Sequence, residues 1–257
     1  LDAYFAFDVS DAILEAVRTG SAAKLFAAVM RLQREVPSDR WSPFLRNHDQ
    51  TRTLTALGGD VARAKLAATL LLTLPGLPFV YYGEEIGMTG DKPDPRLRTP
   101  MQWSRGPGAG FTRGTPWEPL QPDSLTANVE THEADPNSLL NLYRRLIGLR
   151  AENAALGSGD LVPLVASSEA VAAYLRRERD RAVLVVANLR TAPLSGVTLS
   201  SEGRVLPAGR YAPRSLLGGP SAAPLRIGRD GRVQGYVPLR TLASRGTYLF
   251  DLLAGGR

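Results

Sequence analysis

The chain has 257 residues, of which 44% are hydrophobic and 22% are charged, so it carries enough apolar side chains for a sizeable core. It contains no cysteine and no uninterrupted apolar run of about 18 residues, which excludes disulfides, thiolate metal sites and a predicted membrane-spanning helix. Its formal charge of +6 comes mainly from arginines that stand singly or in doublets, whereas nucleic-acid-binding proteins carry a clustered basic stripe. We therefore expect neither a nucleic acid nor a membrane as a partner.

The N-terminal stretch LDAYFAFDVS has neither a Met nor the basic start of a signal peptide. Such a start is typical of the interior of a longer protein. The absence of cysteine fits a reducing or an oxidising compartment equally well, so the sequence predicts no localisation.

Predicted strands and helices alternate through the first 155 or so residues. The apolar runs at residues 1–7, 41–45 and 78–82 have the length of buried strands, and residues 21–36, 59–74 and 136–153 have the spacing of helices. Strands that alternate with helices of this length indicate right-handed crossover units and a parallel sheet. The first part of the chain is therefore predicted to be α/β.

The helix predicted at residues 136–153 carries an apolar stripe that should lie on this sheet. The stripe consists of leucines at helical spacing, and arginines occupy the other side. Asp135 and Pro136 are the expected cap and first turn. The leucines are Leu139, Leu142, Leu146 and Leu149.

Short antiparallel strands are predicted after Gly157, where the helical period disappears. Apolar runs separated by turn signals such as Arg229-Asp230-Gly231 indicate a meander or a sandwich. We place a domain boundary near residue 157, which gives an α/β domain at 1–157 and an all-β domain at 158–257. The predicted strands are at residues 161–166, 170–178, 181–189, 196–200, 224–228, 232–239 and 246–252.

The segment from Gly83 to about Ala134 has no clear period and is far longer than the usual connection of about 4–6 residues. Loops of this size are functional or disordered. Large apolar side chains favour order, since disordered segments are poor in them. The sequence leaves two interpretations of this segment, a functional loop or a lid that only covers the protein's own core. The apolar side chains are Met101, Trp103, Phe111 and Trp117.

Polar residues follow the predicted strand WSPFL in the stretch FLRNHDQTR. If this strand is parallel, Asn47, His48 and Asp49 lie at its C-terminal end, where α/β sheets and barrels assemble their sites. Residue types alone favour a turn, because Asn and Asp are common turn formers. A functional site is favoured by convergence, because the long loop leaves the same edge and a neutral His beside an ionised Asp can bind adjacent hydroxyls.

The motifs FLRNHDQTR, PGLPFVYYGEEIGM and RLRTPMQW, in this order, resemble the region from the sixth strand to the end of the α-amylase superfamily, glycoside hydrolase family 13. The resemblance covers about residues 1–150, and RTPMQW is typical of its α-glucosidase, oligo-1,6-glucosidase and trehalose synthase side. It implies the C-terminal portion, strands six to eight, of a (β/α)8 TIM barrel, followed by that family's all-β C-terminal domain, an antiparallel sandwich.

The resemblance also implies roles for individual residues. Asp49 matches the family carboxylate that binds sugar hydroxyls and stabilises the transition state, so it is the expected catalytic residue. His48 and Asn47 match its substrate-binding neighbours, and Arg98 is an expected substrate or loop contact. Glu84 and Glu85 look like an acid/base pair but match loop residues after the eighth strand, so we expect no direct chemistry from them.

Two carboxylates that retaining glycoside hydrolysis needs, about 5–5.5 Å apart, are not among the matched residues. In the family they come from the fourth and fifth strands, and no RxDxxxH-like segment occurs in this sequence. We therefore expect the chain to be part of a retaining hydrolase or transglycosylase for α-glucans or α-glucosides, inactive without the missing N-terminal barrel half. The alternative is a noncatalytic sugar-binding or assembly subunit. No metal and no cofactor are expected.

Overall fold

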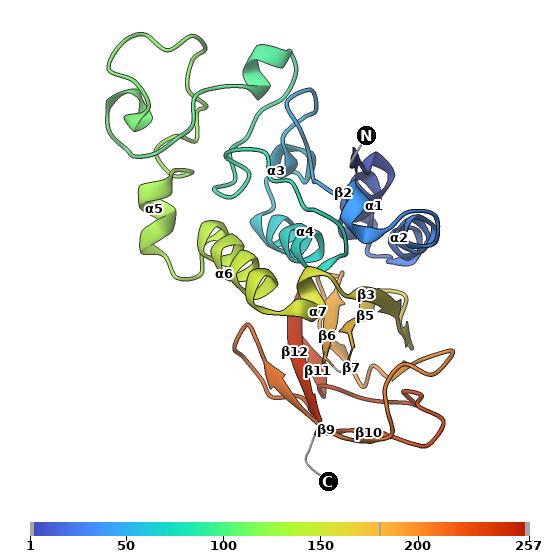
Figure 1. The fold of residues 1–257 in the computed structure, drawn as a ribbon. Helices are drawn as coiled ribbons and strands as arrows, with labels where there is room; N and C mark the ends of the chain where they lie inside the picture. The colour runs from blue at the N-terminus through green and yellow to red at the C-terminus, as the bar shows by residue number, and fades with distance from the viewer. Residues whose placement is uncertain (1–2, 180, 255–257) are drawn as a thin grey trace.

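The structure is a computed structural model that describes residues 3–179 and 181–254 (Figure 1). Helices dominate its first part, and some of the long ones have the boundary residues that helices favour. Asp60 accepts a hydrogen bond from the Arg63 amide at the start of α4, and Gly20 ends α1 with a φ of 77°. The α-helices are α1 (Phe7–Thr19), α2 (Ala23–Glu35), α3 (Thr53–Ala56), α4 (Val61–Thr73), α5 (Val129–Ala134), α6 (Leu139–Glu152) and α7 (Ala154–Gly157).

The parallel sheet predicted for the first part is short. Among the residues that the structure describes, only β1 (Tyr4–Phe5) and β2 (Trp41–Ser42) form a parallel pair. The prediction of a strand at residues 78–82 is wrong: Leu77 and Phe79 donate backbone hydrogen bonds to Trp41 and Pro43, both of 2.8 Å, but no strand forms. Because proline has no N–H, Pro43 cannot return a bond, and the ladder is interrupted.

The sequence pattern also misplaced two features of the helical layer. It does not predict α1, whose buried Val9, Ile13 and Val17 recur every four residues. It places the cap of α6 at Asp135, whereas the Ser138 side chain accepts the hydrogen bond from the Asn141 amide and the helix begins at Leu139. The leucine stripe of α6 is buried as predicted, but the helix packs mainly against α4 and not on the short parallel sheet. Leu139, Leu142 and Leu146 are buried in the core, and Leu149 is partly buried against it.

The second part is built on one antiparallel sheet with the strand order β10-β9-β12-β6-β5-β3 (Figure 1). Two short pairs, β4–β8 and β7–β11, lie outside it. The prediction of a regular strand at residues 232–239 is wrong, since its only pairing within the described residues is an isolated bridge between Tyr236 and Leu199. The strands are β3 (Asp160–Pro163), β4 (Val165–Ala166), β5 (Val171–Glu178), β6 (Arg181–Asn188), β7 (Leu194–Ser195), β8 (Leu199–Ser200), β9 (Gly209–Ser215), β10 (Leu225–Ile227), β11 (Thr241–Leu242) and β12 (Thr247–Ala254).

One apolar core joins the helices to the sheet. It includes Leu25, Leu66 and Leu146 from the helices together with Val183 and Leu249 from the strands. The other face of the sheet has a separate core made with the short strands and loops. The sheet is therefore covered on both faces along β5 and β6, where every residue of β5 from Val171 to Arg176 is buried.

Buried polar contacts fasten the helical layer to the sheet. Arg176, which is fully buried, donates hydrogen bonds of 2.6 Å to the Thr73 carbonyl at the end of α4 and 2.7 Å to the Gly159 carbonyl. The hydroxyl groups of Tyr174 and Thr73 are 2.6 Å apart. These contacts satisfy carbonyl groups that the ends of α4 and α7 would otherwise leave buried and unpaired.

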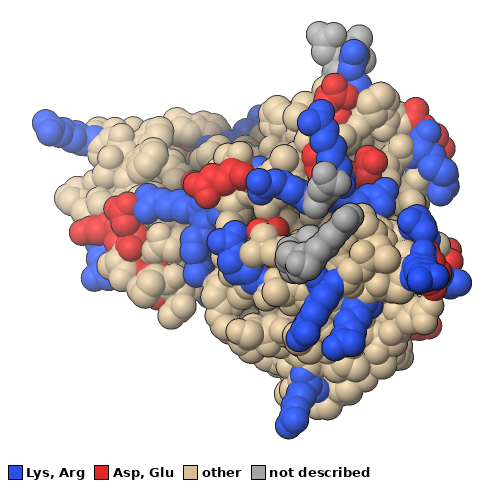
Figure 2. Space-filling view, turned by 60° about the horizontal axis from the view of Figure 1, so that its bottom comes forward, with Lys and Arg blue, Asp and Glu red and all other residues tan. Residues whose placement is uncertain are grey.

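The surface carries most of the charge. Figure 2 shows lysine and arginine side chains distributed over the lower face, in several places beside acidic ones. On the edge strand β10, Arg226 lies directly opposite Arg210 of β9, and like charges at an edge discourage pairing with another strand. None of the helices in the described part of the chain is long and apolar enough to span a membrane.

Candidate active site

The segment that follows β2 leaves the sheet and turns at Asn47. The Asn47 side-chain oxygen accepts a hydrogen bond of 2.9 Å from the Asp49 amide, and its carbonyl accepts one of 3.3 Å from the Gln50 amide. This is the turn chemistry expected of an Asn in that position. The turn leaves the side chains of His48 and Asp49 exposed, at 59% and 56%. The turn and the candidate site are thus the same structure.

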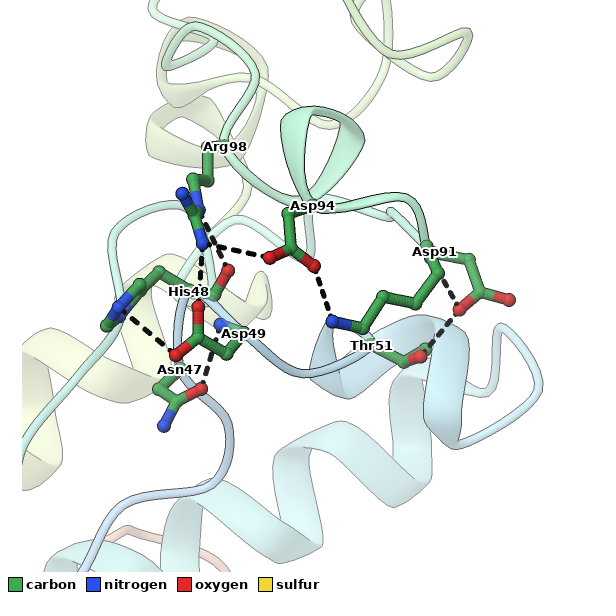
Figure 3. Close-up of polar contacts among 8 residues, drawn as sticks. Asn47, His48, Asp49, Thr51, Asp91, Asp94 and Arg98 are labelled. Carbon is green, nitrogen blue, oxygen red and sulfur yellow. Dashed lines mark hydrogen bonds and ion pairs between the residues drawn. The ribbon is translucent and has the colours of Figure 1, made fainter.

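The long loop returns to this turn through Arg98. Its Nη2 donates hydrogen bonds of 2.6 Å to Asp49 Oδ1 and 3.2 Å to Asp94 Oδ2, and its Nε donates one of 3.0 Å to the His48 carbonyl (Figure 3). The structure therefore brings Asn47, His48, Asp49 and Arg98 together, although Arg98 lies 50 residues after His48. The long loop, which the sequence predicts to leave the sheet at this edge, therefore also contacts the turn.

Asp91 connects the loop to the residues that follow the turn, and Asp94 pairs with two residues of the loop itself, Lys92 and Arg98. Lys92 bonds to Asp94, and Thr51 donates a hydrogen bond of 2.6 Å to Asp91 (Figure 3). The hydrogen bond from Lys92 lowers the pKa of Asp94, and the one from Thr51 lowers the pKa of Asp91. Both carboxyl groups are therefore ionised at neutral pH, and Asp94 competes with Asp49 for Arg98.

An aromatic hollow of about 350 Å³ lies beside Asn47, His48 and Asp49. Phe5 contacts Phe44 and Phe79 edge to face, with ring centroids 5.6 and 4.9 Å apart. Phe5 and Phe79 are about half exposed, at 50% and 52%. A hollow that combines aromatic rings with a carboxylate, an amide and an imidazole suits a molecule with both apolar faces and hydroxyl groups, which describes a sugar.

A larger cavity of about 540 Å³ lies elsewhere, between α2 and the β3–β4 segment. Its walls are mainly apolar, and none of the predicted site residues lines it. Within residues 3–179 and 181–254, no three His, Asp or Glu side chains are grouped so that they could hold a metal ion. The hollow beside Asp49 is therefore the candidate site.

Glu84 is buried away from solvent and has both carboxylate oxygens occupied. Tyr143 on α6 donates a hydrogen bond of 2.6 Å to Oε1, and Thr53 at the start of α3 donates one of 2.8 Å to Oε2. Burial raises the pKa of Glu84 to about 7 and also raises the pKa of Glu85. The Glu84 carboxyl group therefore connects the long loop to α3 and α6. Sequence reasoning could not find this connection, because Tyr143 lies 59 residues away.

The long loop differs from the expectation in one respect. Met101 is buried in a small core with Ile86 and Met88, but Trp103, Phe111 and Trp117 are 51%, 52% and 62% exposed. These three aromatic residues therefore do not order the loop by packing into it. Sequence reasoning also missed Asp94 and Asp91, because nothing in their spacing shows which side chains they meet.

Comparisons with known proteins agree on one family. A family model described as the α-amylase catalytic domain matches residues 5–159. "Alpha-amylase 3" from Dictyoglomus thermophilum is 40% identical over 149 residues, which are 57% of this chain and 29% of that protein. An oligo-1,6-glucosidase from Parageobacillus thermoglucosidasius is 31% identical over 214 residues, or 67% of this chain and 38% of that protein. The chain thus spans about a third of the length of these relatives.

A solved structure shows the same fold. The crystal structure of an α-amylase from H. orenii superposes with a TM-score of 0.78 at 31% identity, and the match covers 98% of this chain and 49% of that one. Nearly the whole chain therefore corresponds to about half of that enzyme. The resemblance seen in the three sequence motifs is confirmed by the family model and by this fold.

Proposed function

Since the chain belongs to the α-amylase family, we propose that it supplies the sugar-binding part of a retaining glycosidase or transglycosylase acting on α-glucosides or α-glucans. Asp49 is the catalytic residue of this part. Its carboxylate binds sugar hydroxyls and stabilises the positive charge that develops on the sugar ring in an oxocarbenium-like transition state. The oligo-1,6-glucosidase relative supports the choice of substrate class.

The neighbours of Asp49 have substrate-binding roles in this proposal. His48 and Asn47 bind adjacent hydroxyl groups, His48 from its exposed position and Asn47 from the turn. Arg98 holds the Asp49 carboxylate at 2.6 Å in the orientation that the sugar meets. The observation that carries the proposal is that these four residues, from two distant segments, meet beside one aromatic hollow.

The nucleophile and the acid/base carboxylate come, in this proposal, from sequence outside the 257 residues. Residues 1–157 correspond to the region of strands six to eight of a TIM barrel, and residues 158–257 to an all-β sandwich domain. The barrel is completed by the N-terminal barrel half, which is the partner of this chain. The match to about half of the H. orenii enzyme supports this division.

The test compares the chain alone with a completed protein, in which the N-terminal barrel half of an oligo-1,6-glucosidase is joined in front of it. We expect no hydrolysis of maltose or of an aryl α-glucoside by the chain alone, because no hydroxyl-binding group replaces the two bond-breaking carboxylates. We expect turnover by the completed protein. A completed protein that is folded and binds maltose without turnover would contradict the proposal and indicate a noncatalytic sugar-binding subunit.

A further inference from the structure

Arg52 is a buried charge with no ion-pair partner within 4 Å among the described residues, although it interacts electrostatically with Glu85. Its side chain follows the turn of the site by three positions and is 2% exposed. Among the residues that the structure describes, none of the ion pairs within 4 Å includes it. Burying a guanidinium group is unfavourable unless its donors are bonded and its charge is compensated. The surroundings of Arg52 provide these in part, since Nε and Nη1 are bonded but Nη2 has no hydrogen-bond partner among the described residues.

Backbone carbonyls of the long loop accept the hydrogen bonds of Arg52. Its Nη1 donates to the Tyr82 carbonyl at 2.7 Å, and its Nε donates to the Leu97 carbonyl at 3.1 Å. Its backbone amide donates to the Gly90 carbonyl at 3.0 Å. Arg52 therefore fixes the beginning, middle and end of the loop segment that runs from Tyr82 to Leu97.

Two tyrosine rings compensate the charge. The guanidinium carbon lies 4.7 Å from the ring centre of Tyr81 and 4.8 Å from that of Tyr82, within the range of cation–π interactions. Glycine makes this packing possible. At Gly83, whose φ is +79°, a Cβ would lie 3.2 Å from Arg52 Nη1 and 2.2 Å from Met88 Sδ. A side chain at this position would clash with Met88 and would crowd Arg52 more mildly.

The hydroxyl groups of the same tyrosines hold the backbone on both sides of Arg98. Tyr81 donates a hydrogen bond of 3.0 Å to the Leu97 carbonyl, which also accepts from Arg52. Tyr82 donates one of 2.6 Å to the Thr99 carbonyl. Arg98 thus projects from a stretch of backbone that is fixed immediately before and after it.

We propose that Arg52, Tyr81 and Tyr82 form a positioning clamp, which holds the backbone around Arg98 so that the Arg98 side chain bonds to Asp49. The inference rests on the proposed role of Asp49. The Arg98 side chain is 40% exposed and has two carboxylates within reach, Asp49 at 2.6 Å and Asp94 at 3.2 Å. A small shift of its backbone exchanges one partner for the other. The clamp prevents this shift, and catalytic geometry tolerates errors of only about 0.5 Å.

The first arm of the test uses the chain alone and requires no activity. Arg52→Lys keeps the charge but loses the planar donor set, and Tyr82→Phe removes only the hydroxyl that holds Thr99. Both should raise amide hydrogen exchange at residues 96–99 by about tenfold. The control is Arg150→Lys, because Arg150 also bonds to the backbone carbonyls of Leu72, Leu74 and Gly76, far from the site. Unchanged exchange at residues 96–99 in both clamp variants would overturn the clamp.

The second arm uses the completed protein. Arg52→Lys and Tyr82→Phe should lower kcat by about 10–100-fold with little change in KM, whereas Arg150→Lys should leave kcat within about twofold. In an Arg98→Ala background the same variants should have no further effect on kcat, since a clamp acts only through Arg98. Additive losses in that background would overturn the clamp while leaving the role of Asp49 intact. If Asp49→Asn retains full activity, it is the proposed function that fails.

Discussion

The antiparallel sheet and the candidate site are held together by different kinds of hydrogen bond. In the sheet, β5, β6 and β12 pair along their length through backbone groups. At the site, β1 and β2 pair over only two residues each, and side chains such as Arg52 and Tyr82 hold the backbone instead. A ladder of backbone bonds does not depend on any one side chain, whereas the site depends on each of them. Single substitutions at the site should therefore lower activity with little loss of stability. Single substitutions in the sheet should lower stability with little loss of activity.

The two regions also differ in exposure. Asp49 and Arg98 are 56% and 40% exposed, so their ion pair is largely solvated and contributes little to folding. Arg176, at the junction of helices and sheet, is fully buried and bonds only to carbonyl groups. Exposed charges can act on a ligand, and buried charges act on the fold. The four predictions that follow test this division.

The largest effect is expected for Asp49→Asn in the completed protein. The amide keeps the size and much of the hydrogen bonding but removes the negative charge near the developing oxocarbenium ion. Losing one preorganised transition-state group costs about 10²–10³ in kcat, or roughly 2.7–4 kcal/mol. Steady-state kinetics on an aryl α-glucoside measures this, and urea unfolding should show almost no loss of stability. The control is Asp8→Asn, an exposed carboxylate paired with Arg31. Near-normal kcat for Asp49→Asn would refute its catalytic role.

Glu84 should make stability depend on pH. Burial raises its pKa from 4.5 to about 7 in the folded state, so between these values the folded protein binds more protons than the unfolded one. The free energy of unfolding should therefore fall as pH rises from about 4.5 to 7 and level off above. At about 1.4 kcal/mol per pH unit the total is roughly 3 kcal/mol.

Glu84→Gln should remove this slope, because the amide is neutral at every pH; its oxygen can accept from one of the Thr53 and Tyr143 hydroxyls, and its NH2 group can donate to the other. Urea unfolding of the variant and the parent chain at several pH values measures the difference, with the exposed Glu152→Gln as the control. Equal slopes in the parent and Glu84→Gln would show that Glu84 titrates normally and is not the buried group that connects α3 and α6.

The regular elements could be predicted from the sequence to the extent that one face is buried. The runs that became β5 and β6 are continuous apolar stretches, and α6 shows its leucine stripe. By contrast, β9 reads GRYAPRS, which has few apolar residues because one face of it stays in water, and it forms only between β12 and β10. Its pairing is a tertiary effect, so no local signal announces it.

Part of the candidate site could also be predicted from the sequence. Asn47, His48 and Asp49 are adjacent in the chain, so a short motif contains them. Arg98 could be named only through the family resemblance, and Arg52 and Asp94 could not be named at all. The roles of Arg52 and Arg98 depend on contacts between segments more than 40 residues apart, such as the 3.1 Å hydrogen bond from Arg52 to Leu97. Spacing along the chain carries no information about such contacts.

A smaller effect, on stability alone, is expected for Arg176→Met. Methionine fills a similar space but leaves the carbonyls of Thr73 and Gly159 without their donors. Unpaired buried carbonyls cost about 1–3 kcal/mol, and removing a desolvated charge offsets part of this, so we expect a loss of about 2 kcal/mol. Urea unfolding measures it, with Arg179→Met as the exposed control. In the completed protein kcat should stay within about twofold. A large fall in kcat would mean that the sheet influences the site.

The smallest effect concerns the stability that the Arg98–Asp49 pair provides. A double-mutant cycle with Arg98→Gln and Asp49→Asn, read by urea unfolding of the chain, should give a coupling free energy below about 1 kcal/mol, since both groups are largely exposed. The comparison pair is Arg214–Asp251 on the sheet, at 3.1 Å, where the Asp251 side chain is only 7% exposed and the coupling should be larger. If the Arg98–Asp49 pair had the larger coupling free energy, Asp49 would be a structural residue that holds the long loop. The proposed division between a site that serves activity and a sheet that serves stability would then be wrong.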